Sequence, residues 1–335
     1  MAGKALITGG AGFIGSHLAE RLLDHGWDVW ALDDLSTGSL QNVDHLRDRD
    51  GFHLVVDSVL QSTVVNELIY RCDVVYHLAA AVGVRLIVEQ PVRTLVTNLR
   101  GTELVLEHCH RFDKRVLVAS TSEVYGDHRE ETPLEETARR IYGPTTQRRW
   151  AYADSKAMDE FLALAHFVEH DLDCTIARLF NTVGPKQSGQ YGMVIPTFVA
   201  HALRDETIEI HGDGHQTRCF CHVDDTVSAL HGLMDDTVSG EIYNVGSTNR
   251  ISVNALAERV IELTGSSSTT VSVPYGEVYG HGIEDMVHRI PSTAKINAAL
   301  GWEPERSLED ILNDVIVFER GRSEAAAAQG PSRAS

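Results

Sequence analysis

The first residues that could bind a ligand form a glycine-rich segment close to the N-terminus. Residues 9–15 read GGAGFIG and stand between a short apolar run and an amphipathic stretch. Glycines at this spacing allow a tight turn, a close approach of backbone to a pyrophosphate, and close packing of a helix on a strand. The first N–H groups of a helix also present the positive end of its dipole to phosphates. The residues of this segment predicted to bind a dinucleotide are Gly9, Gly12, Phe13, Ile14 and Gly15.

Acidic residues follow two of the next β-like runs. Asp33 ends the second run, where a carboxylate accepts hydrogen bonds from the ribose of an adenosine. A carboxylate there repels a 2′-phosphate, so we expect NAD rather than NADP. Asp57 follows the third run and is predicted to lie near the adenine, although an exposed aspartate at a strand end explains it almost as well.

A tyrosine and a lysine four residues apart, Tyr152 and Lys156, would share one face of a helix. A phenol with its ordinary pKa of about 10 is a poor base at neutral pH. A neighbouring ammonium and a positive nicotinamide ring both favour the phenolate, so we expect a lowered pKa for Tyr152. Thr121 and Ser122 follow the fifth β-like run, at the sheet edge where ligands bind, and their hydroxyls are predicted to hydrogen-bond the reacting oxygen.

A parallel sheet would bring these residues together. Over residues 1–180, short β-rich runs alternate with amphipathic stretches, and residues 13–23 place Ile14, Leu18 and Leu22 on one helical face. Such alternation predicts βαβ units with right-handed crossovers, and therefore an α/β fold with a doubly wound parallel Rossmann sheet. The expected strands are residues 5–8, 27–32, 53–56, 74–78 and 115–119.

The pattern loosens after residue 180, where we expect a smaller, discontinuous substrate-binding domain. Residues 181–192 have the composition of a loop. Residues 195–203 and 253–263 are predicted helices, the second ending at Gly265, and 207–211 is a predicted strand. Residues 266–282 are expected to be mostly loop. The predicted division is 1–180 with 217–246 for the Rossmann domain, 181–216 with 247–322 for the substrate domain, and 323–335 for a flexible tail.

Composition narrows the class of protein. The 335 residues are 43% hydrophobic, and 29 basic against 48 acidic residues give a net charge of −19. This charge repels nucleic-acid phosphates and anionic lipid, so neither partner is expected. We find no apolar run of about 18 residues and no signal-peptide core, and the five scattered cysteines argue against a disulfide framework. We therefore expect a soluble cytoplasmic protein.

One cluster could suggest a zinc site: His211, His215, Cys219, Cys221 and His222. Its cysteines are not spaced as a CxxC pair, and the two would fall on the same face of a strand, as core residues do. No metal site is predicted.

The order of several further motifs resembles that of the extended short-chain dehydrogenase/reductase family of nucleotide-sugar epimerases, dehydratases and decarboxylases. The resemblance covers nearly the whole chain. Besides TGGAGFIG at 8–15, the motifs are HLAA at 77–80, TNLRGT at 97–102, STSEVYG at 120–126, YADSK at 152–156, RLFN at 178–181, QTR at 216–218 and LGW at 300–302.

This resemblance implies roles for individual residues. Tyr152 would take the proton of the sugar C4 hydroxyl while hydride passes to NAD, and Lys156 would hold the nicotinamide ribose. Arg218 and Arg289 would clamp the diphosphate of a UDP-sugar together with the Asn181 amide. The remaining implied residues are Leu78, Ala79, Ala80 and Asn98 for the cofactor, Glu123 for catalysis, Val194, Ile195 and Pro196 for an apolar wall at the nucleotide base, and His211 beside that base.

The resemblance also suggests which reaction to expect. Ser122 stands where dehydratases carry an acidic proton donor, which argues against dehydration. Residues 184–196 resemble a 4-epimerase loop, whereas decarboxylases usually carry an arginine at the position of Met193. We expect a UDP-sugar 4-epimerase that interconverts UDP-glucuronate and UDP-galacturonate, or UDP-glucose and UDP-galactose.

Two alternatives stay open. Residues 121–123, TSE, also fit a UDP-glucuronate decarboxylase, and a non-enzymatic NAD sensor or scaffold would keep the fold alone. Arg85, Arg148 or Arg149 would meet a sugar carboxylate, although three exposed arginines are the simpler account.

Members of the resembled family commonly dimerise through two helices, which correspond to residues 98–111 and 152–168 here. A homodimer is therefore expected, although the core of a monomer would use the same residues. Those suited to the contact are Ala157, Met158, Phe161, Leu162, Leu164 and Ala165.

Overall fold

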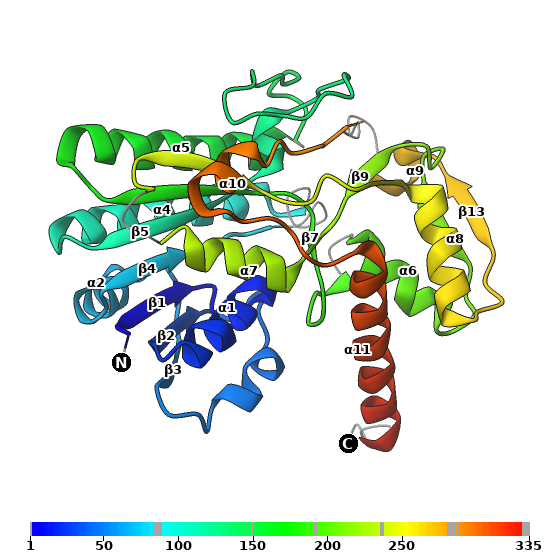
Figure 1. Ribbon diagram of the computed structural model, residues 1–335, viewed down its shortest axis with the longest axis horizontal. Coiled ribbons are helices and arrows are strands. Elements are labelled where there is room, and N and C mark those ends of the chain that lie inside the picture. Colours follow the sequence, from blue (N-terminus) through cyan, green and yellow to red (C-terminus); the bar gives the residue numbers. More distant parts are fainter. Residues whose placement is uncertain are drawn as a thin grey trace.

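A seven-stranded parallel sheet forms the centre of the computed structural model, which describes residues 2–82, 89–148, 150–189, 193–234, 238–279, 286 and 288–329 (Figure 1). The strand order is β11-β6-β5-β4-β1-β2-β3, so the chain reverses its direction of winding between β1 and β4. This is the doubly wound arrangement predicted from the sequence, and ligands bind such sheets at the carboxyl ends of the strands next to the reversal. The strands are β1 (Lys4–Thr8), β2 (Asp28–Asp33), β3 (Phe52–Val56), β4 (Val74–His77), β5 (Arg115–Thr121), β6 (Cys174–Leu179) and β11 (Glu241–Val245).

Helices cover both faces of this sheet. Because side chains alternate along a strand, Ile7 of β1 enters one apolar core and Leu6 enters the other. The core around Ile7 is completed by α1 (Phe13–Asp24), α7 (Val223–Gly232) and α10 (Ala294–Leu300), and the core around Leu6 by α2 (Ser62–Arg71), α4 (Pro91–Arg111) and α5 (Trp150–His170). The predicted apolar face of the first helix is confirmed, since Leu18 and Leu22 are fully buried.

A third apolar core lies beside the sheet, among α6, α8 and α11 (Figure 1). Ile195 of α6, Leu256 of α8 and Ile311 of α11 meet there. Ser252 caps α8, and Gly265 ends it in the left-handed conformation that the sequence predicts. The elements of this part are α6 (Val194–Ala202), β8 (Ile208–His211), β9 (Thr217–Cys219), β12 (Arg250–Ser252), α8 (Val253–Thr264), β13 (Thr270–Val273), α9 (Tyr275–Tyr279) and α11 (Leu308–Gln329).

Short elements connect the two parts. β7 (Thr182–Val183) pairs with β10 (Cys221–His222), and β9 pairs antiparallel with β12. The 3-10 turns are η1 (Leu40–Asn42), η2 (Asp44–Leu46) and η3 (Ser122–Tyr125). In the described ranges no helix has the length and apolarity needed to cross a bilayer.

Two expectations from the sequence are wrong. Residues 266–282 contain β13 and α9, because β13 pairs in parallel with β8, and this pairing leaves no local signal. Residues 323–329 continue helix α11 instead of forming part of a flexible tail. Their alanines and glutamate are good helix formers, so a helix already packed against α6 and α8 continues through them.

Candidate active site

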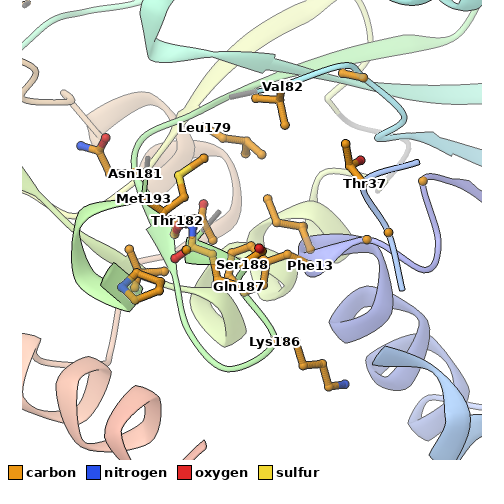
Figure 2. Close-up of a pocket in the computed structure, with 18 of the residues that line it drawn as sticks. Phe13, Thr37, Val82, Leu179, Asn181, Thr182, Lys186, Gln187, Ser188 and Met193 are labelled. Carbon is orange, nitrogen blue, oxygen red and sulfur yellow. Dashed lines mark hydrogen bonds between the residues drawn. The ribbon is translucent and has the colours of Figure 1, made fainter. Parts of the chain in front are cut away.

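A cavity of about 1320 Å³ opens at the carboxyl ends of the central strands and extends to the third core. Figure 2 shows that its walls come from both parts: Phe13 follows the glycine-rich turn, Val82 follows β4, and Met193 precedes α6. The cavity therefore collects side chains that are far apart in the sequence. All described residues predicted for the site line it, with the exceptions of Asn98 and Arg148.

The glycine-rich turn has the geometry of a dinucleotide cradle. Gly9 has φ +75°, and a Cβ there would lie 3.0 Å from the backbone nitrogen of Ala79. A Cβ on Gly15 would collide with the carbonyl oxygen of Gly9. Helix α1 starts after Gly12 without a side-chain cap, so its first N–H groups point to the cavity end of the turn. These positions accept only glycine because backbone and ligand must approach closely.

Asp33 lies at the end of β2 beside this turn. Its Oδ2 accepts the Ala11 N–H at 3.0 Å and its Oδ1 accepts the Leu35 N–H at 2.8 Å. Burial raises the pKa of this carboxyl, and the backbone hydrogen bonds work in the opposite direction. Each oxygen keeps further acceptor capacity, so the carboxylate can bind ribose hydroxyls. Asp57 lines the same end of the cavity. The glycine-rich turn therefore fits the pyrophosphate of NAD, and the Asp33 carboxylate fits its adenosine.

Asn98 does not line the cavity, where its predicted cofactor role would place it. Its side chain is buried, with Oδ1 accepting the Ala81 N–H at 2.9 Å and Nδ2 donating to Ser155 Oγ at 3.1 Å. It therefore ties the loop after β4 to helix α5, behind the wall made by Leu78, Ala79 and Ala80. The spacing of the motif in the sequence could not show whether Asn98 contacts the cofactor or supports the cavity wall from behind.

Tyr152 and Lys156 meet the cavity from the first turns of α5, but their electrostatics differ from the expectation. Burial raises the pKa of Tyr152 above its usual value, and the charges of Glu123 and Asp159 raise it further. The Lys156 ammonium, only 3% exposed, donates to Asp159 Oδ2 at 2.7 Å. The Asp159 carboxylate offsets the positive charge of Lys156. The prediction that Lys156 lowers the pKa of Tyr152 is therefore wrong for the chain by itself.

The end of β5 places three more predicted residues next to Tyr152. Thr121 accepts the Glu123 N–H at 3.2 Å and its hydroxyl also bonds to Tyr152, whose pKa it lowers. Ser122 opens η3 and is buried against the cavity. Glu123 Oε1 lies 3.5 Å from Arg289 Nη1, and both side chains are mostly buried. Arg289 therefore lies at the end of the cavity that holds Glu123 and Tyr152.

The remaining predicted substrate residues line the side formed by the third core. Val194, His211 and Arg218 face the cavity, as do Ile195 and Pro196. Asn181 also lines it, but its amide donates to the carbonyl of Cys219 at 2.9 Å, which takes up one of the two N–H groups expected at a phosphate. Arg148 is exposed and away from the cavity wall, and Arg85 and Arg149 lie outside the described residues.

Several cavity residues were missed at the sequence level. Lys186 has φ +68°, and Figure 2 shows its side chain directed toward α1, where Nζ lies 3.4 Å from Glu20 Oε2. Burial lowers its pKa. Arg93 of α4 and Arg322 of α11 also reach the wall. The position of Lys186 in the predicted loop of residues 181–192 was the available signal, whereas nothing local marks the two arginines.

The histidine–cysteine cluster shows no metal geometry. Cys219 and Cys221 are buried in β9 and β10, and all five cysteines are free thiols. Within the ranges that the structure describes, no three His, Cys, Asp or Glu side chains are grouped to hold a metal ion.

Comparison with known proteins gives consistent matches over most of the chain. A family model described as GDP-mannose 4,6 dehydratase matches residues 6–315. UDP-N-acetyl-alpha-D-glucosaminuronate decarboxylase of Bacillus cytotoxicus is 39% identical over 95% of this chain and 98% of its own. UDP-glucuronic acid decarboxylase 1 of Xenopus tropicalis is 35% identical over 95% of this chain and 72% of its own. The solved UDP-glucose 4-epimerase of Thermus thermophilus, in complex with NAD, is 27% identical with a TM-score of 0.84, covering 95% of this chain and 99% of that one.

These relatives contradict the expectation of a 4-epimerase. Decarboxylases at 39% and 35% identity are more similar in sequence than the solved epimerase at 27%. The expectation rested on residues 184–196, whose described part runs along the cavity toward α6.

Proposed function

The chain belongs to the GDP-mannose 4,6-dehydratase family of NAD-dependent nucleotide-sugar enzymes, and from that premise we propose that it is a UDP-hexuronate decarboxylase. The names of the curated relatives, which include a decarboxylase of UDP-glucuronic acid and one of its 2-acetamido analogue, support this proposal. The observation that carries it is the position of Arg289 beside Glu123 at the reacting end of the cavity.

Arg289 gives this end of the cavity a cation that a neutral sugar would not need. A guanidinium binds a carboxylate through charge-assisted hydrogen bonds in a fixed planar geometry. Glu123 holds the guanidinium from one side at 3.5 Å, and the cavity lies open to it on another. A hexuronate would place its C6 carboxylate there when its C4 hydroxyl faces Tyr152.

The residues around Tyr152 can then carry out the proton transfers. Bound NAD supplies the acceptor for the C4 hydride. The Tyr152 oxygen takes the proton of the C4 hydroxyl, and the oxidised nicotinamide's positive charge favours the phenolate that this requires. The resulting C4 ketone is β to the C6 carboxylate, so the C5–C6 bond can break with release of carbon dioxide.

Loss of carbon dioxide moves negative charge from C6 to the C4 oxygen. Tyr152, which now carries the proton, and the hydroxyls of Thr121 and Ser122 are placed to hydrogen-bond that oxygen as the charge develops. C5 then takes up a proton that comes from solvent, and Glu123 lines this end of the cavity, where it can relay that proton. Tyr152 would return its proton to the C4 oxygen, and the product with NAD bound would be a UDP-pentose.

The test is to incubate the NAD-loaded protein with UDP-glucuronate and with UDP-N-acetylglucosaminuronate. Carbon dioxide is measured directly, and the sugar product is identified by NMR. We expect carbon dioxide and a UDP-pentose from at least one of the two, and neither product from the Tyr152→Phe variant. A C4 epimer formed without carbon dioxide would refute the proposal.

We also propose a homodimer formed through α4 and α5. Met158 and Phe161 on α5 are 55% and 59% exposed, and Val96 and Leu99 on the adjacent α4 are also exposed. Ala157, predicted for the same contact, is buried in the protomer core. Light scattering should give twice the protomer mass, and Phe161→Glu should give the monomer. A monomeric wild type would contradict this proposal.

The domain division and the location stay proposals as well. The separate core around Ile195 and Leu256 supports a substrate-binding domain of residues 181–216 and 247–322. The five buried free thiols support a reducing compartment, and hence the cytoplasm.

A further inference from the structure

Lys156 is paired with a carboxylate that the catalytic scheme does not use. Asp159, one turn further along α5, is 1% exposed and accepts from Lys156 Nζ at 2.7 Å. Its Oδ1 is buried and has no hydrogen-bond partner among the described residues. A buried carboxylate that is only partly hydrogen-bonded costs free energy. Its pairing with the equally buried Lys156 offsets part of that cost, and the unpaired Oδ1 leaves the rest.

A line of buried polar groups leads from the glycine-rich turn to this carboxylate. Thr8 Oγ1, at the end of β1, lies 2.8 Å from His77 Nδ1, and His77 Nε2 lies 3.0 Å from Thr102 Oγ1 on α4. The Thr102 hydroxyl in turn hydrogen-bonds Asp159. The line thus links β1, β4, α4 and α5 beneath the floor of the cavity.

The direction of these hydrogen bonds follows from the histidine. Burial and the Lys156 charge lower the pKa of His77 to about 3, so the ring is neutral and carries one N–H. Thr102 must keep its proton for Asp159, so it can only accept from His77 Nε2–H, and Thr8 then donates to Nδ1. Burial raises the pKa of Asp159, whereas the Lys156 charge and the hydrogen bonds from Lys156 and Thr102, toward which every proton in the line points, favour its charged form.

We propose that Asp159 is a positioning residue that holds the Lys156 ammonium and that its negative charge keeps the Tyr152 phenol protonated until oxidised NAD is bound. The inference rests on the proposed role of Tyr152 as the base. Its consequence is that the phenolate, which is the reactive form, appears only beside a cofactor able to accept hydride.

The other charged groups around this site do not replace Asp159. Glu160 follows it on α5, but both of its oxygens accept from Arg178, at 2.9 and 2.7 Å. Glu123 faces Tyr152 from η3, and Arg289 lies beside it. Asp159 is the carboxylate whose charge acts on both Lys156 and Tyr152.

The test is a pH titration of Tyr152 by near-ultraviolet absorbance, where tyrosinate absorbs more than tyrosine. Subtracting the spectrum of the matching Tyr152→Phe variant removes the other tyrosines. Removal of one nearby charge shifts a pKa by about 1 unit, so we expect the midpoint in Asp159→Asn to fall by that amount. Asp159→Glu, which keeps the charge, should stay near the wild-type midpoint. An unchanged or higher midpoint in Asp159→Asn overturns the proposal.

Asp154→Asn is the matched control, because Asp154 lies on the same helix but is exposed and paired with Arg140. Its midpoint should equal that of the wild type. A second measurement uses the wild type alone, so it does not depend on the folding of a variant. Oxidised NAD should lower the Tyr152 midpoint and NADH should not; equal midpoints with the two cofactors overturn the proposal. None of these titrations uses a UDP-sugar. The Tyr152 midpoints can therefore be interpreted even if the decarboxylase assay fails.

Discussion

Replacing Arg289 by methionine tests how the cavity recognises its sugar. The substitution keeps most of the apolar length of the side chain and removes the guanidinium that lies 3.5 Å from Glu123. A hydrogen bond to a charged group contributes about 1.5–3 kcal/mol. Since about 1.4 kcal/mol corresponds to a factor of ten, kcat/KM for carbon dioxide release from UDP-glucuronate should fall about 10- to 100-fold.

The affinity for UDP separates this role from a diphosphate clamp. UDP has no sugar carboxylate, so its Kd, measured by calorimetry, should be nearly unchanged in Arg289→Met. Arg218→Met is the comparison variant, because Arg218 lines the same cavity from β9, in the part of the protein that holds the third core. It should weaken UDP binding. If Arg289→Met weakens UDP binding as much as it lowers kcat/KM, the assignment of Arg289 to the sugar end is refuted.

Three further outcomes follow from the structure. Gly15→Ala should abolish retention of NAD during gel filtration, because its Cβ would collide with the Gly9 carbonyl; a variant that keeps its NAD would contradict the close-packed turn. Glu160→Gln should lower the free energy of unfolding in urea by about 3–5 kcal/mol, since it breaks a buried pair with Arg178; a loss within error of zero would count against that pair. The pKa of His77 is lowered from 6.5 to about 3 by folding, so between these pH values the unfolded chain binds a proton at His77 that the folded chain does not. Stability should therefore fall as the pH drops from about 6.5 toward 3, and a His77→Gln variant should show a weaker dependence.

The sequence was sufficient where function depends on short-range geometry. The spacing of Gly9, Gly12 and Gly15 predicts the turn because only glycine permits that backbone path. The interval from Tyr152 to Lys156 predicts a shared helix face, and both residues line the cavity. The alternation of apolar runs predicts the parallel sheet, because strands buried on both faces need helices between them.

Tertiary structure decided what surrounds these residues. Arg289 and Glu123 are 166 positions apart, so no local pattern joins them, yet their contact indicates where a sugar carboxylate would bind. Lys156 and Asp159 are close in sequence, but only burial makes their pairing strong enough to compensate the ammonium. The sequence names the groups that carry protons. Their charges depend on desolvation and on partners from other elements, and those exist only once the chain has folded.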